Sequence, residues 1–170
     1  GYDFITDPTV AGDGNGRDNN AADQGDWSAA NACGAGASAS NSSWHGTHVA
    51  GIVAAVGNNA AGVVGTAFNA KLLPLRVLGK CGGYMSDIAD AIVWASGGKV
   101  TGVPANPNPA TVINLSLGGY GSCSTIIGNA ITGAVTRGTA VVVAAGNSNM
   151  DVATSMPANC ANVIAVAATT

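Results

Sequence analysis

The residue of this chain best suited to acid–base chemistry is a histidine at the start of an apolar segment. His45 follows polar residues that can cap a helix, and small and apolar residues continue after it to Ala55 with almost no charge. We expect a helix that is buried on all sides and too short to span a membrane. The positive end of its dipole disfavours imidazolium, so the ring should stay neutral and able to accept a proton. A lone buried histidine is more often structural, so this position alone indicates only a candidate base.

Two further candidate segments each follow a short apolar run that is typical of a strand. The first is Ser116-Leu117-Gly118-Gly119 and the second is Ala144-Ala145-Gly146-Asn147. In parallel sheets the chemistry gathers at the carboxyl ends of the strands. Glycine among small residues also lets an extended peptide approach the backbone closely. Taken alone, a Gly-Asn pair is more often just a turn.

Acidic residues gather in the first part of the chain. Residues 1–26 contain six Asp and one Arg, and the run from Asp13 to Asp18 spaces oxygen donors as calcium loops do, without the later Glu of an EF-hand. A structural calcium ion would offset the repulsion among these carboxylates. The predicted ligands are Asp13, Asp18, Asp23 and Asp26, with Asp7 as a weaker candidate. A solvated acidic turn explains the pattern equally well.

Strand-like and helix-like segments alternate along the chain. The expected strands cover residues 1–5, 70–78, 111–115, 140–144 and 163–167; the expected helices begin at His45, after a cap at Ser86, and at Ser124, the last running to Arg137. The helical spacing turns Ile88, Ala91, Ile92 and Ala95 inward, and likewise Ile127, Ala130, Ile131 and Ala134. Short unbroken apolar strands predict a parallel sheet with helices on both faces. We expect residues 1–170 to form a single domain.

Composition excludes several other functions. Only 9% of the residues are charged, and no basic cluster with interleaved aromatic residues suggests nucleic-acid binding. Neither a targeting segment nor a membrane span is evident. The four cysteines, Cys33, Cys81, Cys123 and Cys160, include no Cys-x-x-Cys pair, so two disulfides in an oxidising compartment fit best. Three pairings are open at this stage.

The run His45-Gly46-Thr47-His48-Val49-Ala50-Gly51 resembles the catalytic-histidine motif of the subtilisin-like serine proteases, the subtilases. This resemblance implies that His45 is the general base and that His48 is a buried structural residue. By the same resemblance, Ser116, Leu117 and Gly118 bind the substrate backbone, Ala144, Ala145 and Gly146 wall the primary specificity pocket, and Asn147 donates to the oxyanion. Leu78 would line the second substrate pocket, and Tyr84 and Met85 a more distant one.

The resemblance also implies a fold and a set of ligands. The fold would be α/β, a three-layer subtilisin-like arrangement with a mostly parallel central sheet and helices on both faces, incomplete at both ends. In that fold the pairings Cys33–Cys81 and Cys123–Cys160 are favoured, because each links neighbouring loops. Structural calcium sites are frequent in this family.

Two parts of the subtilase pattern are not found. Asp13-Gly14 lacks the preceding apolar strand of the triad aspartate, and Ser155 lacks the glycine before it and the helix after it that mark the nucleophile. We therefore expect the chain to be the middle of a catalytic domain that needs its N- and C-terminal parts as partners. In isolation it is expected to be inactive and not stably folded.

The function expected of the intact protein is secreted serine endopeptidase activity on protein or peptide substrates through an acyl-enzyme. An open, uncharged pocket predicts broad specificity, with a leaning to large apolar side chains before the scissile bond. The main alternative is a catalytically inactive fragment or a subtilase-like peptide-binding module. A metal enzyme using His45 and His48 is a weaker alternative, since no Glu follows as in His-Glu-x-x-His and no third ligand is evident.

Overall fold

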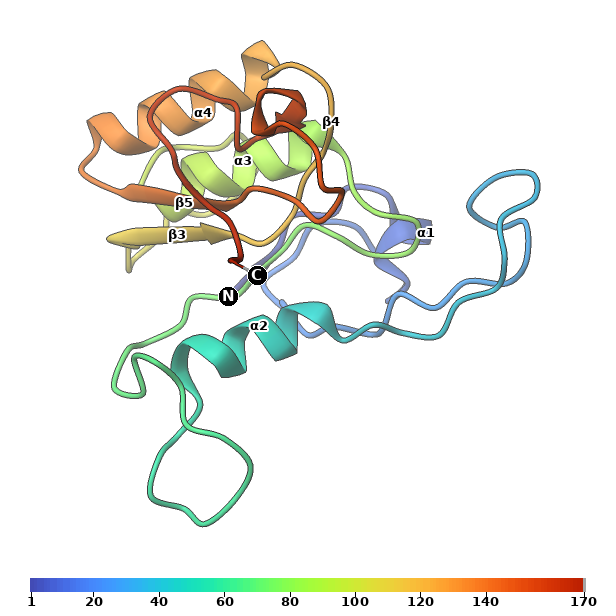
Figure 1. Ribbon diagram of the computed structural model, residues 1–170, viewed down its shortest axis with the longest axis horizontal. Coiled ribbons are helices and arrows are strands. Elements are labelled where there is room, and N and C mark those ends of the chain that lie inside the picture. The colour runs from blue at the N-terminus through green and yellow to red at the C-terminus, as the bar shows by residue number, and fades with distance from the viewer. Residues whose placement is uncertain (170) are drawn as a thin grey trace. The chain divides into compact units, whose positions relative to one another are not determined.

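The computed structural model describes residues 1–169, which divide into two compact units, Gly1–Gly83 and the residues from Tyr84 onward (Figure 1). In the first unit, strand β1 (Tyr2–Asp3) pairs in parallel with β2 (Leu75–Arg76). The expected strand over 70–78 is thus shortened to two residues. Just after β1, Phe4 and Ile5 are fully buried and form the core of this unit.

The acidic loop contains a helix that the sequence pattern did not indicate, α1 (Pro8–Ala11). Proline occupies its first turn, where no backbone donor is needed, and the Asp7 side chain accepts from the Thr9 N–H at 2.8 Å as an N-cap. Asp7 is therefore a capping residue in this structure.

A buried ion pair joins the two strands of this unit. Arg76 Nη1 lies 2.7 Å from Asp3 Oδ2 and 3.4 Å from Asp13 Oδ2, and Arg76 Nη2 donates to the carbonyl of Ala11. Asp3 is completely buried, and this burial raises the pKa of its carboxyl, against the opposing effects of the Ile5 N–H and of Arg76. One guanidinium thus ties together β1, β2 and the end of α1.

Helix α2 (His45–Ala54) begins where the sequence predicts, but none of its residues is buried. Its N-cap residue, Trp44, has a left-handed backbone (φ 51°) and makes no side-chain capping bond. The expectation of burial on all sides is therefore wrong for this structure. Apart from Thr47 and the two histidines the helix consists of small and apolar residues, yet among the described residues of the first unit no strand or other helix packs closely over it.

The second unit contains a three-stranded parallel sheet in the order β3 (Val112–Leu115), β5 (Ala140–Ala144) and β7 (Ile164–Val166). Leu115 pairs with Val143, and Val143 pairs with Ala165. The predicted parallel α/β arrangement is confirmed. Helices α3 (Met85–Ala95) and α4 (Thr125–Thr136) pack against each other and lie on the same side of this sheet (Figure 1).

Burial alternates along β3 and β5, whereas all three residues of β7 are exposed. The side chains of Ile113, Leu115, Val141 and Val143 are buried, whereas Val112, Ile164 and Val166 are exposed. Apolar residues on both sides of a strand indicate that both faces are to be covered. Within the second unit only one face is covered, so the described residues show one of the two predicted helical layers on this sheet.

The helices of the second unit agree with their predicted buried faces. In α4 the Ser124 side chain accepts from the Ile127 N–H, and all four residues expected to point inward are buried. In α3 the inward residues are also buried, but the helix begins one residue before Ser86, with Tyr84 as N-cap. Ser86 is therefore a first-turn residue and not the cap.

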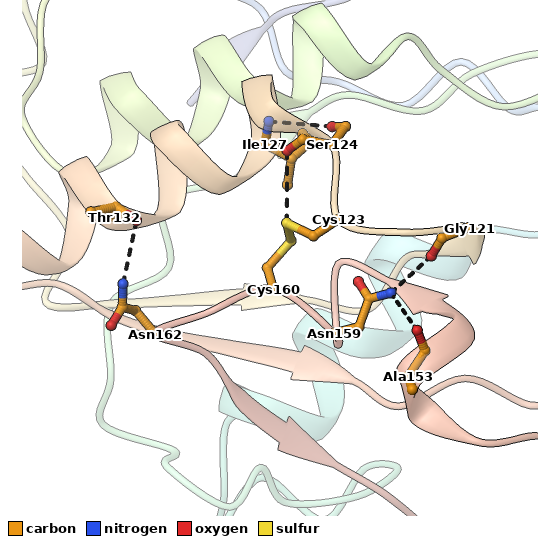
Figure 2. Close-up of a disulfide and its surroundings, with 9 residues drawn as sticks. All are labelled: Gly121, Cys123, Ser124, Ile127, Thr132, Ala153, Asn159, Cys160 and Asn162. Atoms are coloured by element: carbon orange, nitrogen blue, oxygen red, sulfur yellow. Dashed lines mark hydrogen bonds between the residues drawn. A yellow bond between two sulfur atoms is a disulfide. The ribbon is translucent and has the colours of Figure 1, made fainter.

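Both disulfide pairings implied by the resemblance are confirmed. Cys33 is bonded to Cys81 in the first unit, and Cys123 to Cys160 in the second. The second disulfide lies near a small antiparallel pair of strands, β4 (Gly119–Tyr120) with β6 (Ser155–Met156). Strand β6 directly follows the short helix η1 (Val152–Thr154). Figure 2 shows the Asn159 amide donating to the carbonyls of Gly121 and Ala153, at 2.8 and 2.9 Å, which joins these loops.

No helix within residues 1–169 is long and apolar enough to cross a membrane.

Candidate active site

His45 is the first residue of α2 and is exposed. Its backbone N–H donates to Ser43 Oγ at 3.3 Å, which takes the place of the missing N-cap side chain. Ser43 in turn donates to Asp26 twice, from its N–H to Oδ1 at 2.6 Å and from its hydroxyl to Oδ2 at 2.7 Å. These bonds lower the pKa of Asp26, mainly through the Ser43 N–H, and the nearby His45 charge acts in the same direction.

His48 lies one turn further along α2 and is also exposed. The implied role of a buried structural histidine therefore does not match this structure. Its N–H is bonded to the carbonyl of Trp44 at 3.1 Å, as part of the first helical turn.

The two glycine-containing segments lie at the same edge of the sheet in the second unit. They follow β3 and β5, which are adjacent parallel strands, so their carboxyl ends meet. Ser116 and Leu117 are half-buried and Gly118 is exposed, whereas Asn147 stands exposed in the turn after β5. The Ser116 hydroxyl accepts from the Asn114 amide at 2.9 Å.

Several contacts fix these two segments. A Cβ on Gly118 would lie 2.9 Å from the carbonyl oxygen of Met156, so only glycine fits there. Gly146 has φ +105°, a left-handed conformation that favours glycine, and a Cβ there would lie 3.1 Å from Ser155 Oγ. The Tyr120 hydroxyl donates to Ser148 Oγ at 2.6 Å, and this bond links the segment after β3 to the residue that follows Asn147.

The remaining predicted substrate residues are exposed. Leu78 follows β2 in the first unit, whereas Tyr84 and Met85 form the start of α3 in the second. Their exposure leaves them available for contact.

The four predicted calcium ligands are not gathered around one point. Asp13 faces Arg76, and Asp18 accepts from Asn15 and Asn20. Asp23 accepts from the Gly25 N–H, and Asp26 holds Ser43 with both oxygens. No three His, Cys, Asp or Glu residues among positions 1–169 are grouped so that they could hold a metal ion. The side chains as placed therefore do not fit a calcium site, and the same holds for a metal centre built on His45 and His48.

Sequence reasoning missed three features of this region. Asp26 was assigned to a cation, and the structure places it on the segment before His45. The Tyr120–Ser148 bond and the approach of Ser155 to Gly146 depend on the antiparallel pair β4–β6, for which two-residue strands leave no periodic signal.

The fold of the chain is similar to that of solved proteases, among them Sphericase, with a TM-score of 0.57 and 35% identity over 69% of this chain and 37% of that one. The model of the subtilase family matches residues 5–170. The chain belongs to the subtilase family.

Its relatives include extracellular enzymes of bacteria. The chain is 74% identical to the extracellular protease of Xanthomonas campestris pv. campestris and 51% identical to the extracellular basic protease of Dichelobacter nodosus, over 100% of its own length in each case. A solved protease structure from Pseudoalteromonas arctica is 62% identical, with a TM-score of 0.97 over 99% of this chain and 50% of that one. The chain spans 29% of the length of the Xanthomonas protease and 29% of the length of the Dichelobacter protease.

Proposed function

We propose that the protein is a secreted serine endopeptidase that hydrolyses peptide bonds through an acyl-enzyme. The observation that carries this proposal is an exposed His45 at the first turn of α2, within a chain of the subtilase family. The aspartate that orients this histidine and the serine nucleophile would lie outside the chain, in the parts that complete the catalytic domain. The extracellular names of the relatives and the two disulfides support an oxidising, extracellular location.

In this mechanism His45 accepts the proton of the serine hydroxyl as the oxygen attacks the substrate carbonyl carbon. The negative charge that forms on the carbonyl oxygen accepts a hydrogen bond from the Asn147 amide, a role for which the asparagine of subtilisin is the standard example. His45 then gives its proton to the leaving amine, the C–N bond breaks, and the acyl-enzyme remains. Water, deprotonated by the same histidine, releases the acid product and restores the serine.

The substrate would bind as an added strand along Ser116, Leu117 and Gly118. A pocket walled by Ala144, Ala145 and Gly146 carries no charge, so broad specificity with a preference for large apolar side chains before the scissile bond is expected. Leu78 would contact the next side chain of the substrate. Digestion of a peptide library tests this: cleavage should concentrate after Leu, Phe, Tyr and Met, and equal cleavage after Asp or Lys would contradict the proposed pocket.

Calcium as a structural ligand also belongs to this proposal, and the family supports it more than the geometry does. No catalytic step is assigned to a cation. Thermal unfolding of the inhibited protein, with added calcium and with a calcium chelator, tests this proposal. If a calcium site exists, the unfolding midpoint should rise as the calcium concentration increases.

Inhibitor classes separate the enzyme from its alternatives. A serine-directed fluorophosphonate should abolish cleavage, whereas a zinc chelator should leave it unchanged. Loss of activity with the zinc chelator alone would favour the two-histidine metal enzyme. A protein that binds peptides, cleaves none and takes no label would be the non-catalytic module.

A further inference from the structure

The start of α2 is held from outside the helix. Most helices begin with a Ser, Thr, Asp or Asn side chain at the N-cap, which accepts from the first free N–H groups. Here the N-cap is Trp44 in a left-handed conformation, with no side-chain capping bond. The acceptor for the His45 N–H is instead Ser43 Oγ, from the residue before the cap.

The Ser43 hydroxyl is itself oriented by Asp26. A hydroxyl has one hydrogen to donate, and the Ser43 hydrogen is directed to Asp26 Oδ2 at 2.7 Å. This leaves an oxygen lone pair for the His45 N–H at 3.3 Å. The second Asp26 oxygen accepts the Ser43 N–H at 2.6 Å, so the carboxylate holds both the backbone and the side chain of Ser43. Charge-assisted bonds of this length are stronger than neutral ones.

The loop that carries Asp26 is built against the same segment. Gly25 is buried, with φ +90°, and a Cβ at this position would collide with Ser42 Oγ and lie 3.6 Å from the Trp44 ring. Asp23 Oδ1 accepts the Gly25 N–H at 2.8 Å and fixes the turn before Asp26. The loop therefore approaches the residues before His45 as closely as a glycine allows.

We propose that Asp26 is a positioning residue for His45, acting through Ser43 to fix the first turn of α2. The inference rests on the proposed function, because it concerns the general base of that reaction. It also gives Asp26 a role other than the cation ligand that the sequence indicates. In this proposal Asp26 does not contact the reacting atoms. Through Ser43 it fixes the backbone of His45, and so the position from which the imidazole side chain extends.

The test uses the full-length secreted protein with Asp26→Ala, Ser43→Ala, the double variant Asp26→Ala/Ser43→Ala, and Ser43→Thr. Asp90→Asn on α3 is the control for loss of one carboxylate elsewhere. The kcat and KM for a peptide substrate are measured together with the rate of fluorophosphonate labelling and the thermal midpoint. Displacement of a catalytic group by about 1 Å can cost roughly 100-fold in rate, so we expect kcat and the labelling rate to fall about 10- to 100-fold in both single alanine variants, with KM little changed.

Because the two residues act as one unit, the double variant should be no slower than the slower single variant, within about threefold. Ser43→Thr keeps the hydroxyl and should restore kcat to near the wild-type value. Asp90→Asn should leave kcat unchanged.

The proposal is overturned if Asp26→Ala is as active as Asp90→Asn, or if the losses of the two single variants multiply in the double variant. If Asp26→Ala is not secreted, the comparison of Ser43→Ala with Ser43→Thr tests the proposal instead. Equal kcat values for these two variants would overturn it, and a lower kcat in Ser43→Ala alone would support it. A wild-type protein that neither cleaves peptides nor takes the label would instead refute the proposed function, so the two failures are distinguishable.

Discussion

At the scale of single residues, Asn147 carries the clearest chemical expectation. It stands in the turn after β5, and in the proposed mechanism its amide donates to the oxyanion of the tetrahedral intermediate. Replacing it with alanine should lower kcat about 100- to 1,000-fold, the loss known for the corresponding residue of subtilisin, because the bond strengthens only in the transition state. The KM should change little. Steady-state kinetics on a peptide amide check this, and a rise in KM at constant kcat would indicate a ground-state binding role instead.

Asp26 also predicts a pH dependence of stability. Its pKa lies below the usual value of 3.8, chiefly because it accepts the Ser43 N–H. A carboxyl with a lowered pKa in the folded state stabilises that state above its unfolded pKa, and this stabilisation is lost as the pH falls through the folded pKa. The thermal midpoint of the inhibited protein should therefore fall more steeply below pH 3.8 in the wild type than in Asp26→Asn. Parallel curves for the two proteins would contradict the assignment.

At the scale of elements, the packing of α4 is the best defined feature of the second unit. Ile131 is fully buried on its inner face, whereas Ile126 on the same helix is 48% exposed. Ile131→Ala should lower the free energy of unfolding by about 2–5 kcal/mol, through lost burial and a cavity. The matched change Ile126→Ala should cost clearly less. Chemical denaturation of both variants, made in the full-length protein, measures the difference, and equal losses would show that α4 is not packed as described.

The helices and strands differ in how well they could be predicted from the sequence alone. The bounds of α4, β5 and β3 and the buried positions of both helices follow from apolar spacing, because each element packs against its immediate neighbours. The short elements α1, β4 and β6 do not, since two to four residues carry no period and depend on tertiary contacts. The disulfide pairing required a family resemblance, because spacing left three choices.

The candidate site divides in the same way. That His45 begins a helix and that Asn147 follows a strand could be predicted from the sequence. The exposure of α2 could not be predicted, because an apolar helix is expected to be covered by other parts of the protein. The sequence of the helix does not show which part would cover it. The Asp26–Ser43 contact spans 17 positions between irregular segments, where no pattern signals which side chains meet.

At the scale of the whole molecule, the described residues include many large apolar side chains that are exposed. Val112, Ile164 and Val166 on the open face of the sheet are each more than half exposed. An exposed apolar patch on this scale marks an interaction site or an aggregation risk. The isolated chain should therefore bind a hydrophobic dye such as ANS and unfold without a sharp transition. A cooperative thermal transition without dye binding would contradict this expectation.

The proposed role of His45 as the general base of a serine endopeptidase can be tested by labelling of the serine nucleophile. The intact mass of the full-length protein and of its His45→Ala variant is followed after addition of a serine-directed fluorophosphonate. We expect one adduct on the wild type, and labelling at least about 1,000-fold slower in the variant, because the serine then lacks the group that takes its proton. An unlabelled wild type, or a variant that labels at the wild-type rate, would contradict it.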